Sequence, residues 1–417
     1  MKTLLMAVIG MAAVEAGAIG IENVTAQQRW PWNNLVDVDY EITGAKEGDE
    51  FLVTLTATSS MGTKSYAATT YRSDPIGVAG QNRLTWDFGK DYPNVKATDL
   101  EISVTATPFT NSVSGGAYMV IDLAEGKDAK RYPVWYTTKD PVHSVNAEDA
   151  CKTTEFWFKR IRVAPFNFMS ADTIPNGLFT VKFTKDFYMG VFETTQQQWF
   201  QVMGTWPSFY SNLTYRATRP AEKLPLDGSA SGVFGHNNWP TKMEPTEKSF
   251  VGRMRAKTGL ASFNLPTEAQ WEFANRCGYN GTTNPAYKQS EICFNRGDGD
   301  ASSGLEAGPV CVGTYPPNPW GLYEMFGNAN EMCADSGVDE DKLPVLYADE
   351  IEQFGFVTDP IGPPNSGDVP IKPSYQYIHV VRGAYWGSSS GWLLHRKRHV
   401  STTGASGKGA RFVVTCR

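Results

Sequence analysis

The sequence predicts an α+β protein with two parts, a small all-β sandwich over residues 35–125 and a loop-rich domain over residues 153–417. Three observations indicate this class. Short runs of the first part alternate apolar and polar residues, and helix-capping signals occur in the second part. Turn-forming residues are abundant throughout, with 39 glycines and 25 prolines among 417 residues. Residues 126–152 are polar and irregular and are predicted to link the two parts.

The first part contains runs in which every second residue is apolar. In LVDVDYEIT the apolar residues are Val36, Val38, Tyr40 and Ile42, and the residues between them are polar. The runs FLVTLTATS and LEISVTAT repeat this pattern. Successive side chains of a strand point to opposite faces, so each run buries one face and leaves the other in water. Short alternating runs separated by Gly, Asp and Pro turns are typical of a β-sandwich.

The second part contains three segments with signals for the start and end of a helix. TTQQQWFQVMG and LPTEAQWEFANRCG each carry a capping box, formed by Thr195 with Gln198 and by Thr267 with Gln270. In a capping box the threonine hydroxyl accepts from the backbone three residues later, and the glutamine side chain bonds back to the threonine N–H. The third segment, TEKSFVGRMRAKTG, ends at Gly259. Three helices leave most of this part to loops.

The first 18 residues are typical of a secretory signal peptide. MKTLLMAVIGMAAVEAGA begins with the charge of Lys2, continues with an apolar run, and ends on the small residues of a cleavage signal. We therefore expect a mature protein that starts near Ile19 and is secreted or held at the cell surface. The apolar run is too short to cross a membrane as a helix, so no transmembrane segment is predicted.

The cysteines and the charge exclude several classes of function. Export permits disulfides among the six cysteines, but the sequence does not choose between the possible pairings. No CxxC motif is present, so neither a zinc knuckle nor a thioredoxin-like redox centre is predicted. The net charge is −6, so the chain offers no basic footprint and no nucleic-acid partner is expected.

Five motifs of the second part occur in the order found in a known family. They are FYMGVFETTQQQWFQVMG, RPAEKLP, LPTEAQWEFA, PPNPWGLYEMFGNANEM, and VVRGAYW followed by GARFVV. In this order they resemble the formylglycine-generating enzyme (sulfatase-modifying factor) family, which implies a loop-rich variant of the C-type-lectin-like fold. The resemblance covers residues 155–417. The β-module in front resembles the N-terminal domain of some secreted bacterial members, which implies a bacterial origin.

The resemblance also identifies the positions of a missing catalytic pair. Oxidase members of the family carry two cysteines, with four residues between them, after an Arg-Gly-Gly-Ser-Trp strand. That pair binds copper(I) and oxidises a sulfatase cysteine to formylglycine, and it needs thiolates because Cu(I) is a soft ion. In this chain the motif runs from Arg382 to Trp386, and the two positions fall on Ser388 and Leu393. We therefore expect no copper and assign no catalytic residue.

A calcium site is implied by the same family. In its members the segment after GLY binds Ca²⁺ through oxygen atoms, and here that segment reads GNANEM. The implied ligands are the side chains of Asn328 and Glu331 with the carbonyls of Gly327 and Ala329. An all-oxygen set suits a hard cation such as Ca²⁺. The alternative is a turn held only by the hydrogen bonds of the Asn and Glu side chains.

A second oxygen-rich stretch, NRGDGDASSG, lies where the family has another calcium site. It offers Asn295 and Asp298 as ligands. The stretch lacks the glutamate that closes a helix–loop–helix calcium loop, so a solvated turn is its alternative.

The loop that replaces the copper pair remains a candidate binding surface. Tyr385, Ser388 and Trp392 combine aromatic side chains with a small polar one, a mixture that is common in recognition surfaces. We therefore predict a non-catalytic binding or structural protein whose ligand is an extracellular protein or a glycan. The competing interpretation of Trp392 is that it packs the domain.

Two other functions stay open at this stage. One is an enzyme in the same pocket, either an oxidoreductase of the formylglycine-generating type or one that uses Ser388 as a nucleophile with His395 or His399 as its base. The other is a ligand receptor varied by a diversity-generating retroelement, a role that C-type-lectin-like domains of this kind also serve. The Ser, Gly, Thr and Tyr content of residues 385–408 is compatible with that role.

Overall fold

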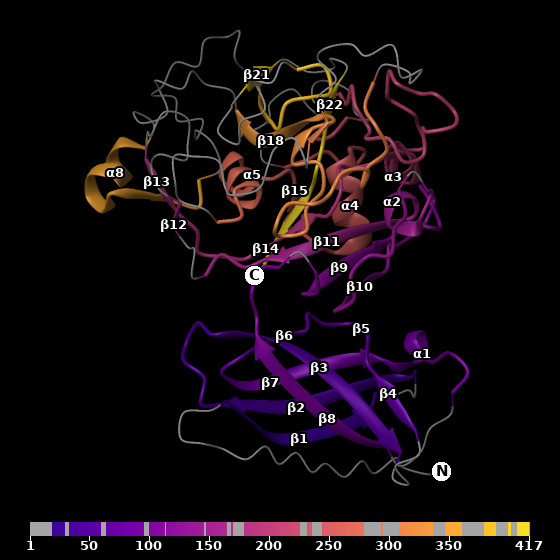
Figure 1. Ribbon diagram of the computed structural model, residues 1–417, viewed down its shortest axis with the longest axis vertical. Coiled ribbons are helices and arrows are strands. Elements are labelled where there is room, and N and C mark those ends of the chain that lie inside the picture. The colour runs from indigo at the N-terminus through magenta and orange to yellow at the C-terminus, as the bar shows by residue number, and fades with distance from the viewer. Residues whose placement is uncertain are drawn as a thin grey trace. The chain divides into compact units, whose positions relative to one another are not determined.

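The computed structural model describes most of the chain after residue 18 (Figure 1). The described residues are 19–29, 33–59, 64–95, 100–112, 114–145, 147–164, 168–169, 179–225, 232–235, 244–278, 293–294, 308–336, 347–360, 379–388, 399–401 and 407–416. The predicted signal peptide and the candidate residues Asn295, Asp298 and Trp392 lie outside them. The chain divides into two compact units, Met1–Val120 with Val134–Asp140, and Ile121–Pro133 with Pro141–Arg417.

The first unit is built from two antiparallel sheets, drawn in indigo and purple in Figure 1. One sheet has the order β1 (Gly20–Gln28), β2 (Leu35–Thr43), β7 (Gly80–Asp87), β5 (Thr70–Tyr71), β10 (Val134–Thr137). In the other, β3 (Glu50–Ser59) pairs with β4 (Ser65–Ala67), β6 (Ile76–Val78) and β8 (Leu100–Pro108). A one-turn helix, α1 (Phe88–Asp91), follows β7.

The alternation of the sequence explains the core of this unit. Val36, Val38, Tyr40 and Ile42 of LVDVDYEIT are buried, as are the apolar residues at every second position of β3. Side chains of both sheets belong to one hydrophobic cluster, which defines a sandwich. Along β8 the burial fades, because Leu100 and Ile102 are buried whereas Val104 and Ala106 are only partly covered. The predicted alternation is therefore confirmed, most strongly in β2 and β3.

Residues 126–152 contain more regular structure than the predicted linker. They include β10, which pairs with β5, and most of α2 (Ala150–Thr153). Before them lies β9 (Tyr118–Asp122). Tyr132 and Trp135 are buried, and the Lys90 ammonium lies 3.5 Å from the centre of the Trp135 ring. Within this polar stretch, Trp135 and Tyr136 are neighbours in β10. Trp135 is buried, and Tyr136 packs against the core of the sandwich.

The second unit combines several small sheets. The largest antiparallel one has the order β11 (Glu155–Ile161), β14 (Phe187–Gly190), β23 (Val413–Thr415), β15 (Phe263–Asn264). A second has the order β21 (His399–Ser401), β20 (His379–Arg382), β18 (Asn330–Ser336), β22 (Lys408–Gly409). The remaining strands are β12 (Phe168–Met169), β13 (Thr180–Lys182) and β19 (Phe356–Thr358) in one group, and β16 (Cys293–Phe294) with β17 (Phe326–Gly327).

The three predicted helices are present in this unit. They are α3 (Gln196–Met203), α4 (Phe250–Thr258) and α5 (Glu268–Asn275). Both capping boxes form as predicted, and Gly204 and Gly259 end their helices in the left-handed conformation. A further helix, α8 (Ala348–Phe354), was not predicted. The α+β, loop-rich class is confirmed. In the described part of the chain, each helix is too short or too polar to cross a membrane.

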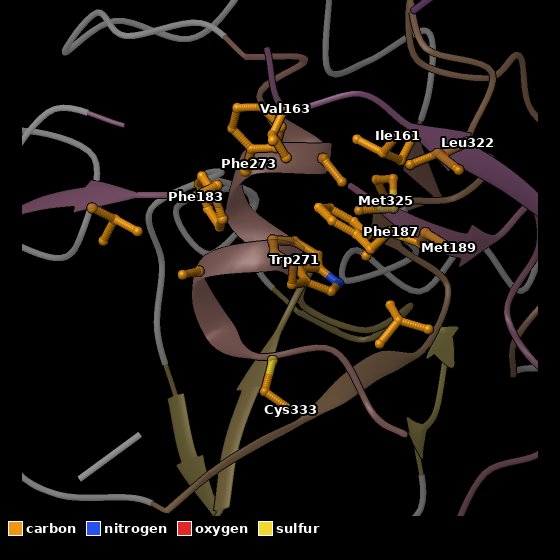
Figure 2. Close-up of a cluster of buried hydrophobic side chains, with 14 of the residues drawn as sticks. Ile161, Val163, Phe183, Phe187, Met189, Trp271, Phe273, Leu322, Met325 and Cys333 are labelled. Carbon is orange, nitrogen blue, oxygen red and sulfur yellow. The ribbon is translucent and has the colours of Figure 1, made fainter. Parts of the chain in front are cut away.

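The core of the second unit surrounds α5. Figure 2 shows Trp271 and Phe273 projecting from this helix among Phe183, Phe187 and Met325. Trp271 and Phe273 are at most 1% exposed. The position of α5 fixes β18 and β20, the strands that carry the candidate site.

Candidate functional site

The candidate site begins where β20 ends. After Arg382 the chain turns through Gly383 and Ala384, whose φ angles are 89° and 64°. A side chain at Gly383 would place its Cβ 3.2 Å from the ring of Trp271, so glycine permits both the turn and the close packing. Ala384 adopts the left-handed region without that freedom, at a cost of about 1 kcal/mol. The direction in which the loop leaves the sheet is thus set by the core.

Ser388 closes this loop on itself. Its backbone N–H donates to the Tyr385 carbonyl at 2.9 Å, and its Oγ accepts from the Tyr385 N–H at 3.1 Å. The residue is only 9% exposed. The hydroxyl at the position of a family cysteine therefore has a structural partner. The second position, Leu393, lies outside the described residues, as do His395 and the side chain of His399.

The loop presents two aromatic rings, and a distant segment adds two more. The ring of Trp386 makes edge contacts with Tyr385 and Tyr210, with ring centres 6.0 Å and 5.5 Å apart. Tyr210 in turn makes an edge contact with Phe209, with ring centres 5.0 Å apart. We call Phe209, Tyr210, Tyr385 and Trp386 the aromatic face. Sequence reasoning found Tyr385 but missed Phe209 and Tyr210, because no local signal places residues 209–210 beside residue 386.

The segment that carries Phe209 is exposed to solvent. Phe209 is 62% exposed, and Leu213 and Tyr215 in the same segment are 76% and 37% exposed. The indole N–H of Trp386 is buried and has no hydrogen-bond partner among the described residues. Exposed apolar side chains in one short segment beside an unsatisfied donor are features of a binding surface.

Glu222, in the RPAEKLP motif, joins the segment of Phe209 and Tyr210 to Gly407. One carboxylate oxygen accepts from the backbone N–H groups of Phe209 and Tyr210, the latter at 3.0 Å. The other oxygen accepts from the Gly407 N–H at 3.0 Å. Glu222 is fully buried. A buried carboxylate that accepts three N–H bonds is a strong anchor, so the conformation of residues 208–210 is fixed from beneath.

The predicted calcium segment lies directly under the loop. Asn328 has a φ of 57°, and its carbonyl accepts from the Trp386 N–H at 2.9 Å. Its Oδ1 accepts from the Val310 N–H at 2.9 Å, and its Nδ2 donates to the buried Glu193 at 2.5 Å. The Glu193 carboxylate also accepts from the Ala329 N–H at 2.8 Å. Every polar group of the Asn328 side chain therefore has a partner within the protein.

Glu331 is engaged in a buried ion pair. Its Oε1 lies 2.6 Å from the Arg411 guanidinium, and its Oε2 accepts from the Trp271 indole N–H at 2.6 Å. Arg411 donates its remaining N–H groups to the carbonyls of Gly190, Val191 and Tyr323. Both charged side chains are at most 1% exposed. This pair joins β18 to the segment before β23.

These contacts decide how well the four implied ligands fit a calcium ion. The side-chain oxygens of Asn328 and Glu331 both accept from protein donors, and the cation beside Glu331 is Arg411. A Ca²⁺ ion at this point would have to displace that guanidinium, so the side chains as placed do not fit it. The geometry is that of the hydrogen-bonded turn. Among the described residues, no group of three or more His, Cys, Asp or Glu converges as a metal site. Calcium binding stays a prediction.

The buried carboxylates of Glu193, Glu324 and Glu331 lie close to one another and to the Arg411 guanidinium. Burial, together with the nearby charges of Glu331 and Glu324, raises the pKa of Glu193 well above its ordinary value. Burial also raises the pKa of Glu324 to about 7, although its oxygens accept from the N–H groups of Gly313 and Tyr315. The region therefore takes up protons more readily than an exposed cluster would.

The described cysteines do not supply the missing thiolates. Cys151, Cys277, Cys311, Cys333 and Cys416 are present as thiols. Burial raises the pKa of Cys151 to about 12 and that of Cys333 well above its usual range. Buried neutral thiols are weak metal ligands and weak nucleophiles. Soft-metal chemistry therefore has no support from Cys151 and Cys333.

The fold and this site define a loop-rich α+β domain in which buried glutamates and an arginine hold a surface loop. The chain belongs to the sulfatase-modifying factor family, since the family model described as "Sulfatase-modifying factor enzyme 1-like domain" matches residues 18–415. The match extends over the β-sandwich as well, whereas the motifs in the sequence begin near residue 155.

Curated relatives match a part of the chain. The serine/threonine-protein kinase pkn1 of Chlamydia caviae is 31% identical over 151 residues, which are 36% of this chain and 20% of the kinase. The chaperone protein LppX of Paenibacillus barcinonensis is 28% identical over 180 residues, which cover 36% of this chain and 61% of LppX. The matches thus span a minor part of the kinase and less than two thirds of LppX.

Solved structures with a related shape are also found. Treponema denticola variable protein 1 has a TM-score of 0.42 and 22% sequence identity, covering 66% of this chain and 99% of that protein. PvdO from Pseudomonas aeruginosa has a TM-score of 0.37 and 17% identity, covering 65% of this chain and 99% of PvdO.

Proposed function

We propose that this chain is an exported, non-catalytic member of its family that binds an extracellular protein through the aromatic face. The observation that carries the proposal is the contact of Ser388. At the position where oxidase members have a thiol, this chain has a hydroxyl that accepts from the Tyr385 N–H. A hard, occupied hydroxyl does not hold copper(I), so the loop is left with a structural and recognition role.

The composition of the exposed segment favours a protein over a glycan as the ligand. Leu213 is an aliphatic side chain that is 76% exposed, close in sequence to the exposed ring of Phe209. Exposed aromatic and aliphatic side chains together form the dry centre of protein–protein contacts, where a few aromatic residues supply most of the affinity. The anchoring of this segment by Glu222 lowers the entropic cost of binding, because the rings are already in place.

Export is the second part of the proposal and rests on the sequence. The charged, apolar and small-residue regions of residues 1–18 stand in the order of a signal peptide. Expression of the full chain with a C-terminal tag in a bacterial host tests this part. We expect the tag in the extracellular or periplasmic fraction and an N-terminus near Ile19. A tagged protein that retains Met1 in the cytosol would refute export.

Binding is tested with two probe collections, a phage-displayed random peptide library and an array of immobilised glycans. We expect peptides enriched on the full chain to bind the Phe209→Ala variant at least about tenfold more weakly. The matched control is Phe354→Ala, which removes a 53% exposed ring of α8. Peptides that bind both variants equally would contradict the proposed face. Glycan binding that depends on Phe209, without peptide binding, would contradict the choice of a protein ligand.

A further inference from the structure

A cavity away from the aromatic face remains without a role. It has a volume of about 330 Å³, and its lining comes from the ends of β13, β15 and β19, from α4 and the start of α5, and from β23. No residue of the aromatic face lines it. Its size lies at the lower end of the range for small-molecule sites.

The cavity contains an arginine whose charge is poorly compensated. Arg255 of α4 donates its Nε–H to the Phe263 carbonyl at 2.9 Å. This bond fixes the position of the guanidinium and leaves the N–H groups of its two terminal nitrogens as donors for a ligand. Within the described part of the chain the ion-pair partner of Arg255 is the Glu244 carboxylate, which is 3.9 Å away and 93% exposed. The Arg255 side chain is 21% exposed, and its desolvation lowers its pKa. A half-buried guanidinium with a distant, solvated partner is suited to an anionic ligand.

A second cation and an amide face the same space. Lys185 lines the cavity and is exposed, and within the described ranges no ion pair joins it to a carboxylate. The Oδ1 atom of Asn264 accepts from the Leu265 N–H at 2.9 Å, which leaves its amide N–H groups as donors. The carboxylate in the lining, Asp359, already accepts from the N–H and hydroxyl of Thr184. The lining thus has donors in excess over acceptors.

The rest of the lining is apolar. Phe183, Leu265 and Val413 are each at most 4% exposed and belong to the interior of the unit. They provide a wall that would contact a hydrocarbon group but not a fully hydrated ion. The combination of a cationic side and an apolar side selects a ligand that has both.

We propose that this cavity binds a small organic carboxylate, with its carboxylate group on Arg255 and Lys185 and its apolar body against Phe183, Leu265 and Val413. The planar guanidinium matches a carboxylate with two parallel hydrogen bonds. Inorganic phosphate meets the charge requirement but leaves the apolar wall without contact, so it binds more weakly.

The test uses the full chain and ligand-observed ¹⁹F NMR with 4-fluorobenzoate, its neutral analogue 4-fluorobenzamide, and inorganic phosphate as a competitor. We expect 4-fluorobenzoate to bind and 4-fluorobenzamide to bind at least about tenfold more weakly, because a charged hydrogen bond is lost. Phosphate competes only at higher concentration. Equal binding of the benzoate and the benzamide, or no binding of the benzoate, overturns the proposal.

Variants locate the binding. Arg255→Met and Lys185→Met are expected to weaken 4-fluorobenzoate binding by about tenfold and by a smaller factor, respectively. The matched control is Arg253→Met, on the same helix but outside the lining. Lys185 is exposed, so its variant folds even if Arg255→Met is destabilised. Phe209→Ala leaves this binding unchanged, which separates the cavity from the aromatic face. Binding that survives Lys185→Met and a folded Arg255→Met contradicts the site.

Discussion

The two units of this protein differ in the kind of side chains that they bury. The β-sandwich has an apolar core drawn from alternating strands, and the arginine of each described ion pair is in contact with solvent: the side chains of Arg29, Arg72 and Arg83 are 41%, 36% and 56% exposed. The loop-rich unit instead contains pairs in which both partners are buried. Its pairs of Arg411 with Glu331 and of Arg382 with Glu272 are essentially inaccessible to solvent.

The difference follows from how much regular structure each unit has. Strands satisfy most of their own backbone groups, so the core of the sandwich is mainly apolar. Loops leave many N–H and C=O groups without partners, and buried side chains must satisfy them. Arg411 bonds three carbonyls and Glu222 three N–H groups, and both lie close to the candidate site. The buried carboxylate of Glu222 therefore holds the part of the aromatic face that contains Phe209 and Tyr210.

The largest expected effect comes from breaking the buried pair. Arg411→Met leaves Glu331 buried without its cation and three carbonyls without donors, and we expect a loss of about 3–5 kcal/mol in the stability of the second unit. Chemical denaturation followed by hydrogen-exchange mass spectrometry measures each unit separately. Adding Glu331→Gln removes the uncompensated charge and should recover part of the loss. No recovery would show that the carbonyl contacts, rather than the ion pair, dominate.

A smaller effect is expected from Glu222→Gln. The amide keeps one acceptor but loses the charge and presents N–H groups to backbone donors, which costs about 1–3 kcal/mol. Hydrogen exchange of residues 208–210 should become faster, and peptide binding at the aromatic face should weaken with it. Glu247→Gln, an exposed change in the same unit, serves as the control. Unchanged exchange at residues 208–210 would mean that Glu222 does not anchor the face.

The stability of the second unit should depend on pH in a direction opposite to that of a salt-bridged carboxylate. The folded unit raises the pKa of Glu324 from 4.5 to about 7, so between these values the folded state binds a proton that the unfolded state has lost. This contribution is complete below pH 4.5 and is lost as the pH rises through 7.

We expect a decrease of about 2–3 kcal/mol from this group between pH 5 and 7.5. Glu324→Gln, which cannot ionise, should flatten the curve by that amount. The measurement is the difference between the denaturation curves of the two proteins at each pH. A difference that does not change with pH would show that Glu324 is ionised throughout.

The smallest effect is expected from the surface pair of the sandwich. Arg83→Ala removes a partner of Asp39 at the edge of solvent, and such pairs contribute little to stability because water weakens the attraction between their charges. The melting of the first unit should shift little, and less in high salt because the charges are screened. If Arg83→Ala lowered the stability of the first unit as much as Arg411→Met lowers that of the second, the proposed difference between the two units would be wrong.

The spacing of residues in the sequence predicted the strands of the sandwich and the starts of two helices. The strands of the sandwich and both capping boxes follow from spacing alone. The acidic run from Asp335 to Gln353 predicts a solvated insertion. Its first residue is nevertheless buried and accepts from the Glu268 N–H at 2.6 Å, and part of the run forms α8. Polarity alone does not reveal that a carboxylate will be needed to cap a helix.

The candidate site was predictable only in part. The motif placed Tyr385 and Ser388 in one loop, and the structure brings them together. The partners of that loop were not predictable, because Tyr210 and Glu222 are more than 150 residues away from Trp386 in the sequence. Contacts at that separation depend on tertiary packing, which leaves no periodic signal. The sequence likewise did not decide whether Glu331 binds a metal ion or pairs with an arginine, since a carboxylate can do either.

The central claim is that the loop closed by Ser388 recognises a partner and does not oxidise one. Its most direct test is incubation of the full chain with copper(I), oxygen and a cysteine-containing sulfatase peptide, followed by mass measurement of the peptide. We predict that the peptide mass matches that of a control with copper alone. A protein-dependent mass loss that corresponds to conversion of the cysteine to an aldehyde would contradict the account.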